Sequence, residues 1–195
     1  MIIWLNGAFG AGKTQTAYEL HRRIPDSFVF DPENTGYYIR DNIPMEAARS
    51  DFQEHLLWRT FNYEMLTYIT SRYEGTIIVP MTITDVGYWD EIVGRLRGDG
   101  LNLRHFTLTL TKDTLKRRLR SRFEGSRSWA AQQMDRCVRE LAGDAFAEHV
   151  YTDHLTISQT AELIAAKLHI ELIPDRRSRL RKTVDRLITQ IKHIR

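Results

Sequence analysis

The sequence has few of the residues that stabilise secreted and metal-binding folds. Its single cysteine, Cys137, excludes an internal disulfide framework and is typical of a reducing compartment, and its seven histidines show no zinc-type spacing. No hydrophobic run approaches the length of a membrane-spanning helix, and the apolar N-terminus lacks the basic leader of a signal peptide. We therefore expect a cytoplasmic protein.

The charge of the chain is concentrated at one end. The whole chain has a formal net charge of +3, with 42% hydrophobic and 27% charged residues, which is ordinary for a soluble globular protein. Residues 174–195 carry eight Lys and Arg against two Asp, a net +6, so residues 1–173 sum to −3. We expect one domain over 1–173, followed by a basic C-terminal segment over 174–195.

Short apolar strands alternate with helical stretches along the domain. Apolar runs closed by glycine, proline or polar residues predict strands at 1–6, 27–30, 76–79, 104–110 and 149–152. Helical spacing predicts helices at 13–23, 45–73, 86–96, 112–122, 128–141 and 161–168, with 45–73 expected to be two helices. This order predicts an α/β three-layer sandwich with a parallel five-stranded sheet, as in P-loop proteins of the nucleoside monophosphate kinase type.

A complete phosphate-binding loop follows the first strand. Residues 7–14 read GAFGAGKT, which matches G-x-x-x-x-G-K-[ST] and lies between a predicted strand and a predicted helix. A glycine-rich turn without a ligand is the alternative, and this context argues against it. The loop predicts ATP as cofactor, with Lys13 as a catalytic cation on its phosphates and Thr14 as a ligand of Mg²⁺. The expected ATP-binding residues are Gly7, Ala8, Phe9, Gly10, Ala11, Gly12, Lys13, Thr14 and Gln15.

The carboxylate that often accompanies such a loop is missing from the third strand. Residues 77–81 read IIVPM, where a Walker B strand would end in aspartate. Asp31, at the end of the second strand, is therefore our candidate for the catalytic base and for a second Mg²⁺ ligand beside Thr14. A turn or helix-cap role is the alternative for Asp31. Glu33 is a weaker candidate, and Asp85 is expected only to cap the helix that follows it.

Arginines cluster after the fourth strand. Arg118 and Arg122 are four residues apart and share one helix face, so we expect both to hold phosphates as catalytic residues of a lid at about 117–136. Arg136 is a weaker candidate for the same role. A solvated basic helix is the alternative, and it is what we expect for the other arginines of that helix.

The region between the second and third strands is where nucleotide kinases hold the acceptor. It is rich in aromatic residues, which suit a base or a sugar ring, and an arginine there suits an anionic group such as a diphosphate. Core packing is the alternative and the stronger interpretation for most of these aromatic residues. Besides Asp31, the candidate substrate-binding residues are Tyr37, Arg40, Arg59 and Met81.

The basic C-terminal segment predicts an amphipathic helix. Its apolar stripe consists of Leu180, Val184, Leu187, Ile188, Ile191 and Ile194, and most of its Arg and Lys residues lie off the stripe. Three alternatives stay open: packing on the sheet domain, contact with an anionic membrane surface, and nucleic-acid binding. Nucleic acid is the least favoured partner, because such a helix would not need so regular an apolar stripe. Membrane contact would place the protein on the inner face of the plasma membrane.

Several segments also resemble one bacterial family. Residues 1–23 (MIIWLNGAFGAGKTQTAYELHRR), 57–63 (LWRTFNY), 77–83 (IIVPMTI), 129–138 (WAAQQMDRCV) and the segment from 174 onward closely resemble the tunicamycin-resistance proteins. The resemblance implies an ATP-binding P-loop protein of nucleoside-kinase-like fold that protects bacteria from tunicamycin, a uridine-containing lipidated nucleoside antibiotic. It is compatible with peripheral membrane association through the C-terminal helix. It implies phosphate binding by Gly7, Gly10, Gly12, Lys13 and Thr14, and it leaves open whether the drug is phosphorylated or only bound.

The residues and the resemblance together predict an ATP-dependent phosphotransferase. The acceptor is expected to be a hydroxyl of a small nucleoside-like molecule, either tunicamycin or a uridine nucleotide. ATP-dependent sequestration of tunicamycin at the membrane surface, without phosphorylation, is the alternative. A nucleic-acid binder that uses the C-terminal segment is a third, less favoured, interpretation.

Overall fold

Five parallel strands form one sheet, in the order β2-β3-β1-β4-β5. The computed structural model describes residues 1–120 and 129–192. The strands are β1 (Ile2–Gly7), β2 (Ser27–Val29), β3 (Thr76–Pro80), β4 (Leu103–Thr109) and β5 (His149–Tyr151). The central strand β1 pairs with β3 on one side and with β4 on the other. The predicted α/β fold with a five-stranded parallel sheet is therefore confirmed.

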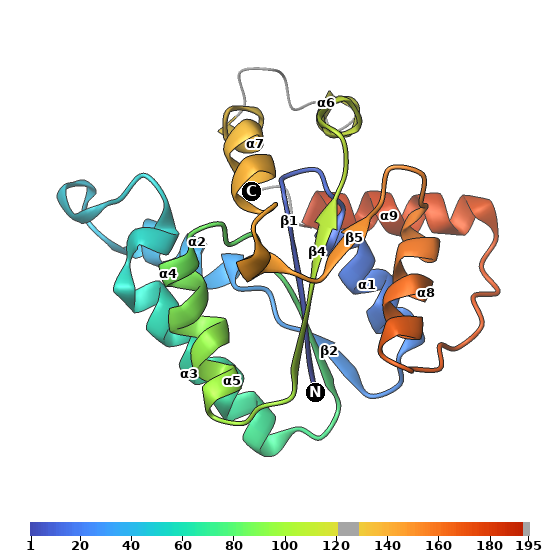
Figure 1. The fold of residues 1–195 in the computed structure, drawn as a ribbon, viewed down its shortest axis with the longest axis horizontal. Helices are drawn as coiled ribbons and strands as arrows, with labels where there is room; N and C mark the ends of the chain where they lie inside the picture. Colours follow the sequence, from blue (N-terminus) through green and yellow to red (C-terminus); the bar gives the residue numbers. More distant parts are fainter. Residues whose placement is uncertain (121–128, 193–195) are drawn as a thin grey trace.

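Helices cover both faces of the sheet and make three layers (Figure 1). One face carries α2 (Glu33–Asn42), α3 (Leu56–Arg72) and the consecutive helical turns α4 (Val86–Trp89), η3 (Asp90–Gly94) and α5 (Arg95–Gly98). The other face carries α1 (Lys13–Arg23), α8 (Ile157–Lys167) and α9 (Arg179–Lys192). Helices α6 (Lys112–Arg120) and α7 (Trp129–Glu140) lie beyond the carboxyl ends of the strands. A short 3-10 turn, η4 (Asp144–Phe146), precedes β5.

The neighbouring strands β1 and β3 are buried on both faces of the sheet because they are largely continuous apolar runs. The side chains of Ile2, Ile3, Trp4 and Leu5 in β1 are fully buried, as are those of residues 77–79 in β3. Each fully buried side chain of this size contributes roughly 1.5–3 kcal/mol relative to an exposed one. The sheet is therefore a rigid platform, and its carboxyl edge holds the loops that carry polar residues.

Residues 33–55 differ from the sequence-based expectation. The helix predicted from residue 45 begins at Leu56, because Pro44 is extended and only single 3-10 turns, η1 (Met45–Ala47) and η2 (Phe52–Glu54), precede it. Helix α2 was not predicted. Its central residue, Gly36, lies against the ring of Phe52, where an added Cβ would be 2.5 Å from the ring atom Cγ. Close packing of this ring therefore requires glycine inside the helix, against its low helix propensity.

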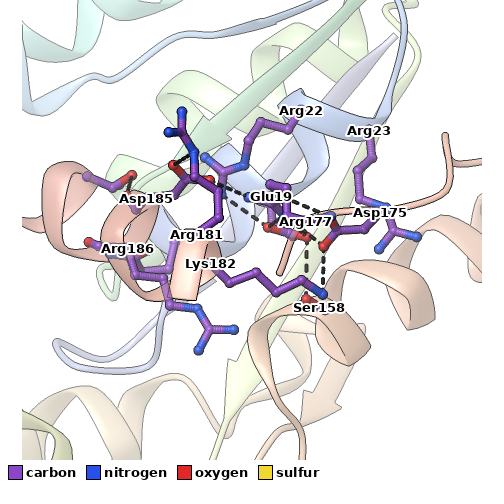
Figure 2. Close-up of polar contacts among 12 residues, drawn as sticks. Glu19, Arg22, Arg23, Ser158, Asp175, Arg177, Arg181, Lys182, Asp185 and Arg186 are labelled. Carbon is purple, nitrogen blue, oxygen red and sulfur yellow. Dashed lines mark hydrogen bonds and ion pairs between the residues drawn. The ribbon is translucent and has the colours of Figure 1, made fainter. Parts of the chain in front are cut away.

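An ion-pair network attaches the C-terminal segment to α1 (Figure 2). The Arg177 guanidinium donates to both carboxylate oxygens of Glu19 at 2.7 Å, and also to Asp175 and Asp185. The Glu19 side chain is almost fully buried. Burial raises the pKa of Glu19, but hydrogen bonds and charge from Arg177 and Arg22 outweigh it, so the pKa lies below its ordinary value. Glu19 therefore stays charged inside the interface.

Helix α9 packs against α1 through its polar side. Gln15 donates from Nε2 to the Arg186 backbone oxygen at 2.9 Å, and Thr189 is buried. Four residues of the apolar stripe point away from the domain: Leu180 is 80% exposed, and Val184, Leu187 and Ile188 are also exposed. The side chain of Ile191 and the whole of Ile194 lie outside what the structure describes. Within the described ranges, no helix is long and apolar enough to cross a membrane.

Replacement of Arg177 with methionine is expected to lower the free energy of unfolding by roughly 3–5 kcal/mol, because the buried Glu19 carboxylate loses its main partner. Urea unfolding followed by circular dichroism measures this change. Arg176→Met is the matched control, because Arg176 is exposed and makes no ion pair with any described residue. Equal losses of unfolding free energy in the two variants would contradict a stabilising role for the ion-pair network.

Glu19 should also make stability depend on pH. Because its folded-state pKa is lowered, its stabilisation is complete above the unfolded value, about 4.3, and is lost as the pH falls through the lower folded value. The difference in unfolding free energy between the wild type and Glu19→Gln should therefore shrink in acid. A difference that stays constant from pH 7 down to acid unfolding would argue against a charged Glu19.

Candidate functional site

The loop between β1 and α1 has the geometry of a phosphate-binding loop. Gly7, Gly10 and Gly12 all have positive φ, at 144°, 84° and 99°. A Cβ on Gly7 would lie 2.9 Å from the Leu108 backbone oxygen, so only glycine fits there. The loop ends at the N-terminus of α1, where the backbone amides of a first helical turn and the helix dipole favour an anion. This loop therefore fits the phosphate groups of a nucleotide.

Lys13 supplies the cation of the loop. Its side chain is only 8% exposed, and its ammonium group donates to the backbone oxygens of Gly7 and Ala8 at 2.9 and 3.2 Å. The ring of Phe9 lies 5.5 Å from the same nitrogen. The ammonium group is thus held inside the curve of the loop, within reach of any phosphate bound there.

Asn6 fixes the segment after β3 against this loop. Its Oδ1 accepts from the backbone nitrogens of Gly7 and Ile83 at 2.8 and 3.1 Å, and its Nδ2 donates to the Ile83 backbone oxygen at 2.8 Å. The Thr82 hydroxyl also donates to the Gly7 backbone oxygen at 2.8 Å. All of these atoms are buried. The sequence analysis did not identify either side chain, because nothing in a single asparagine before a glycine loop indicates its partner.

Arg118 connects the phosphate loop with the loop after β5. Its guanidinium donates to the backbone oxygens of Ala11 at 3.1 Å and of Thr152 at 3.2 Å. Helix α6 thus brings a second cation into contact with the backbone of the phosphate loop. Arg122 lies outside the described residues, as does much of the expected lid. The catalytic roles of both arginines stay predictions.

Asp31 follows β2 and is partly exposed at the carboxyl edge of the sheet. Its Oδ1 accepts from the Glu33 backbone nitrogen at 3.0 Å, so it holds the first turn of α2 as well. Its negative charge contributes to the raised pKa values of Tyr18 and Tyr37, for which burial is the largest cause. The Thr14 hydroxyl and the Asp31 carboxylate are oxygen ligands of the kind that Mg²⁺ prefers.

The other candidate acceptor residues lie in three separate places. Tyr37 donates to Glu33 at 3.1 Å, and the exposed Arg40 guanidinium lies 5.0 Å from the Tyr37 ring, so these two form one group near Asp31. Arg59 is buried between α3 and η3, where it donates to a Glu91 carboxylate oxygen at 2.6 Å. Met81 is buried in the core after β3. Their roles in substrate binding stay predictions.

A pocket of about 130 Å³ opens beside the phosphate loop. Its lining comes from the loop itself, η2 and its N-cap, the segment after β3, helix α4 and helix α7: Phe9, Asp51, Gln53, Glu54, Thr82, Thr84, Asp85, Tyr88, Arg136 and Cys137. Burial raises the pKa of the Cys137 thiol, which is one of the groups that line the pocket. Of these residues, the sequence analysis had proposed only Phe9 and Arg136 as candidates for function. Asp85 caps α4 as expected, by accepting from the Tyr88 backbone nitrogen.

Comparisons with known proteins agree with this architecture. Residues 2–143 match a protein family described as AAA domain. No curated protein matches the chain. Among solved structures, the tunicamycin resistance protein of Deinococcus radiodurans is 38% identical with a TM-score of 0.77, and the match covers 89% of this chain and 98% of that protein.

More distant structures share the fold. A sugar kinase from a Janibacter species is 16% identical with a TM-score of 0.59, and the match covers 87% of this chain and 94% of the kinase. Shikimate kinase from Bacteroides thetaiotaomicron is 22% identical with a TM-score of 0.56, over 87% of this chain and 99% of the kinase. At these identities the likeness is one of fold, that of small P-loop kinases. The chain belongs to the AAA-domain family and to the tunicamycin-resistance proteins.

Proposed function

We propose that this protein is an ATP-dependent phosphotransferase that acts on a hydroxyl of tunicamycin and so confers resistance to that antibiotic. The observation that carries the proposal is the arrangement of two cations around one phosphate loop: Lys13 lies inside the loop, and Arg118 donates to its backbone at Ala11. Two positive groups stabilise the charge that develops on a phosphoryl group during transfer. Its relative from Deinococcus radiodurans, described as a tunicamycin resistance protein, supports the choice of acceptor.

The proposed reaction moves the γ-phosphoryl group of ATP to the acceptor. The bond from the phosphorus to the ADP oxygen breaks, a bond to the acceptor oxygen forms, and the hydroxyl proton passes to the carboxylate of Asp31. Lys13 and Arg118 compensate the charge on the transferred group. When bound by Thr14 and Asp31, Mg²⁺ would neutralise phosphate charge and orient the oxygens for transfer.

Sequestration without turnover is the second candidate, and the exposed stripe of α9 favours it. Leu180, Val184, Leu187 and Ile188 lie on one side of a helix that carries several Arg and Lys residues, which is the composition of a helix that lies on an anionic membrane. Because the polar side already packs on α1, this apolar side is available without any rearrangement. Phosphorylation of the drug, or its absence, decides between the two candidates.

Mass spectrometry of tunicamycin incubated with ATP, Mg²⁺ and the protein tests the phosphotransferase. We expect a product heavier by one phosphoryl group, and a fall in its rate of roughly 100-fold or more in Lys13→Ala and in Asp31→Asn. Lys116→Ala and Asp113→Asn are matched controls, because both residues are exposed on α6. Unmodified drug that still binds the protein tightly would exclude transfer and support sequestration.

Co-sedimentation with lipid vesicles tests the stripe. Binding to vesicles with anionic lipid is expected to exceed binding to neutral vesicles. The double variant Leu187→Gln with Ile188→Gln should lose most of the vesicle binding, because each substitution removes apolar area that the membrane would bury. Leu57→Gln is the control, since Leu57 is exposed on α3. If the double variant sediments as the wild type does, the stripe is not the contact surface.

A further inference from the structure

The pocket beside the phosphate loop is placed to hold an acceptor. Phe9 forms one wall, and the segment after β3, fixed to the loop by Asn6, forms another. Helix α7 closes a third side with Arg136 and Cys137. Because Phe9 belongs to the phosphate loop and its ring lies 5.5 Å from the Lys13 ammonium nitrogen, a group bound against Phe9 lies close to that loop.

The lining is rich in hydrogen-bond acceptors that have capacity left. Oδ1 of Asp51 accepts from the Gln53 backbone nitrogen at 2.9 Å, and Oδ1 of Asp85 accepts from the Tyr88 backbone nitrogen at 2.9 Å. No described residue donates to the second oxygen of either carboxylate. Gln53 is only 9% exposed, and its Nε2 donates to the Thr82 backbone oxygen, while its Oε1 has no partner among the described residues. These oxygens can therefore accept hydrogen bonds from a ligand bound in the pocket.

The charge of the pocket points to an uncharged ligand. Asp51, Glu54 and Asp85 outnumber the single cation, Arg136. That guanidinium also lies 3.9 Å from the carboxylate of Glu140, so part of its charge is already compensated. A phosphate group placed against Asp51 and Asp85 would therefore be repelled, whereas hydroxyl groups there could donate hydrogen bonds to the two carboxylates.

The size and the lining of the pocket limit the class of ligand further. A volume of about 130 Å³ is below the roughly 300–1,000 Å³ typical of sites for whole drug-sized ligands, so the pocket takes one ring-sized part of a larger acceptor. Phe9 and Tyr88 offer apolar ring surface. The Tyr88 ring is held by the Arg59 guanidinium, 4.2 Å from its centre, so its position in the wall is fixed. Ring surface combined with acceptor oxygens is suited to a sugar, which has apolar faces and hydroxyl edges.

We propose that this pocket binds a neutral sugar ring of the acceptor, and that Asp51 and Asp85 accept hydrogen bonds from its hydroxyl groups and select against phosphorylated acceptors. The inference rests on the phosphotransferase proposed above and specifies the acceptor class, a neutral glycosidic compound rather than a nucleoside phosphate.

Isothermal titration calorimetry with tunicamycin tests the pocket in Asp51→Asn and Asp85→Asn. Asparagine keeps the size of each side chain and its capping role, so both variants should fold. We expect tunicamycin affinity to fall roughly 10- to 100-fold in each variant, because a charge-assisted hydrogen bond is lost. ATP affinity should stay unchanged. Glu64→Gln, on the exposed side of α3 and outside the pocket, is the matched control and should bind as the wild type does.

Competition with UMP tests the selectivity. UMP at the same concentration should not displace tunicamycin from the wild type. Unchanged tunicamycin affinity in both variants, displacement by UMP, or no tunicamycin binding by the wild type would each overturn the proposal. The phosphotransferase is judged separately, by the mass of the drug after incubation with ATP. Phosphorylated drug with unaffected variants would reject only the pocket, and variant-sensitive binding without phosphorylation would reject only the transfer.

Discussion

The buried hydrogen bonds of Asn6 are the interaction on which the carboxyl edge of the sheet depends. One amide side chain satisfies the first backbone nitrogen of the phosphate loop and both backbone groups of Ile83. It therefore sets the distance between the loop and the segment that leads to Asp85. A buried backbone group left without its partner costs roughly 1–3 kcal/mol, so a side chain that cannot make these hydrogen bonds would destabilise this edge of the sheet. Asn6 thus holds together the phosphate loop and the segment after β3, both of which line the pocket. The hydrogen bond from the Thr82 hydroxyl to the Gly7 backbone oxygen is a second link between them.

Charged groups are used inside this fold mainly to hold segments in place. Arg59 links η2 to η3 through the Gln53 backbone oxygen and Glu91, and Arg177 links the C-terminal segment to α1 through Glu19. Buried ion pairs contribute little net stability compared with apolar packing, but they tolerate only one geometry. Both arginines are therefore better understood as positional constraints than as sources of binding energy.

The parts of the structure that depend on local sequence were predictable, and the parts that depend on distant packing were not. Strand β1, the phosphate loop and α1 could be predicted from one continuous pattern of residues. The helix that carries Arg118 could be predicted from the spacing of its residues. Helix α2 depends on Phe52 lying over Gly36, and the position of Asp51 depends on how η2 is attached to α3; neither has a local signal. The orientation of α9 is the reverse of the ordinary expectation for an amphipathic helix, because ion pairs rather than apolar area bind it to the domain.

The hydrogen bond from Gln15 to the backbone of Arg186 joins two segments that are far apart in the sequence. Gln15 belongs to the first turn of α1, directly after Thr14, and α9 is the last helix described. The first turn of α1 and helix α9 are thus structural neighbours, and the C-terminal segment covers part of the helix that the phosphate loop starts. Deletion of that segment would therefore not be a neutral trimming of the protein, since it would leave Glu19 without Arg177 and uncover one side of its first helix.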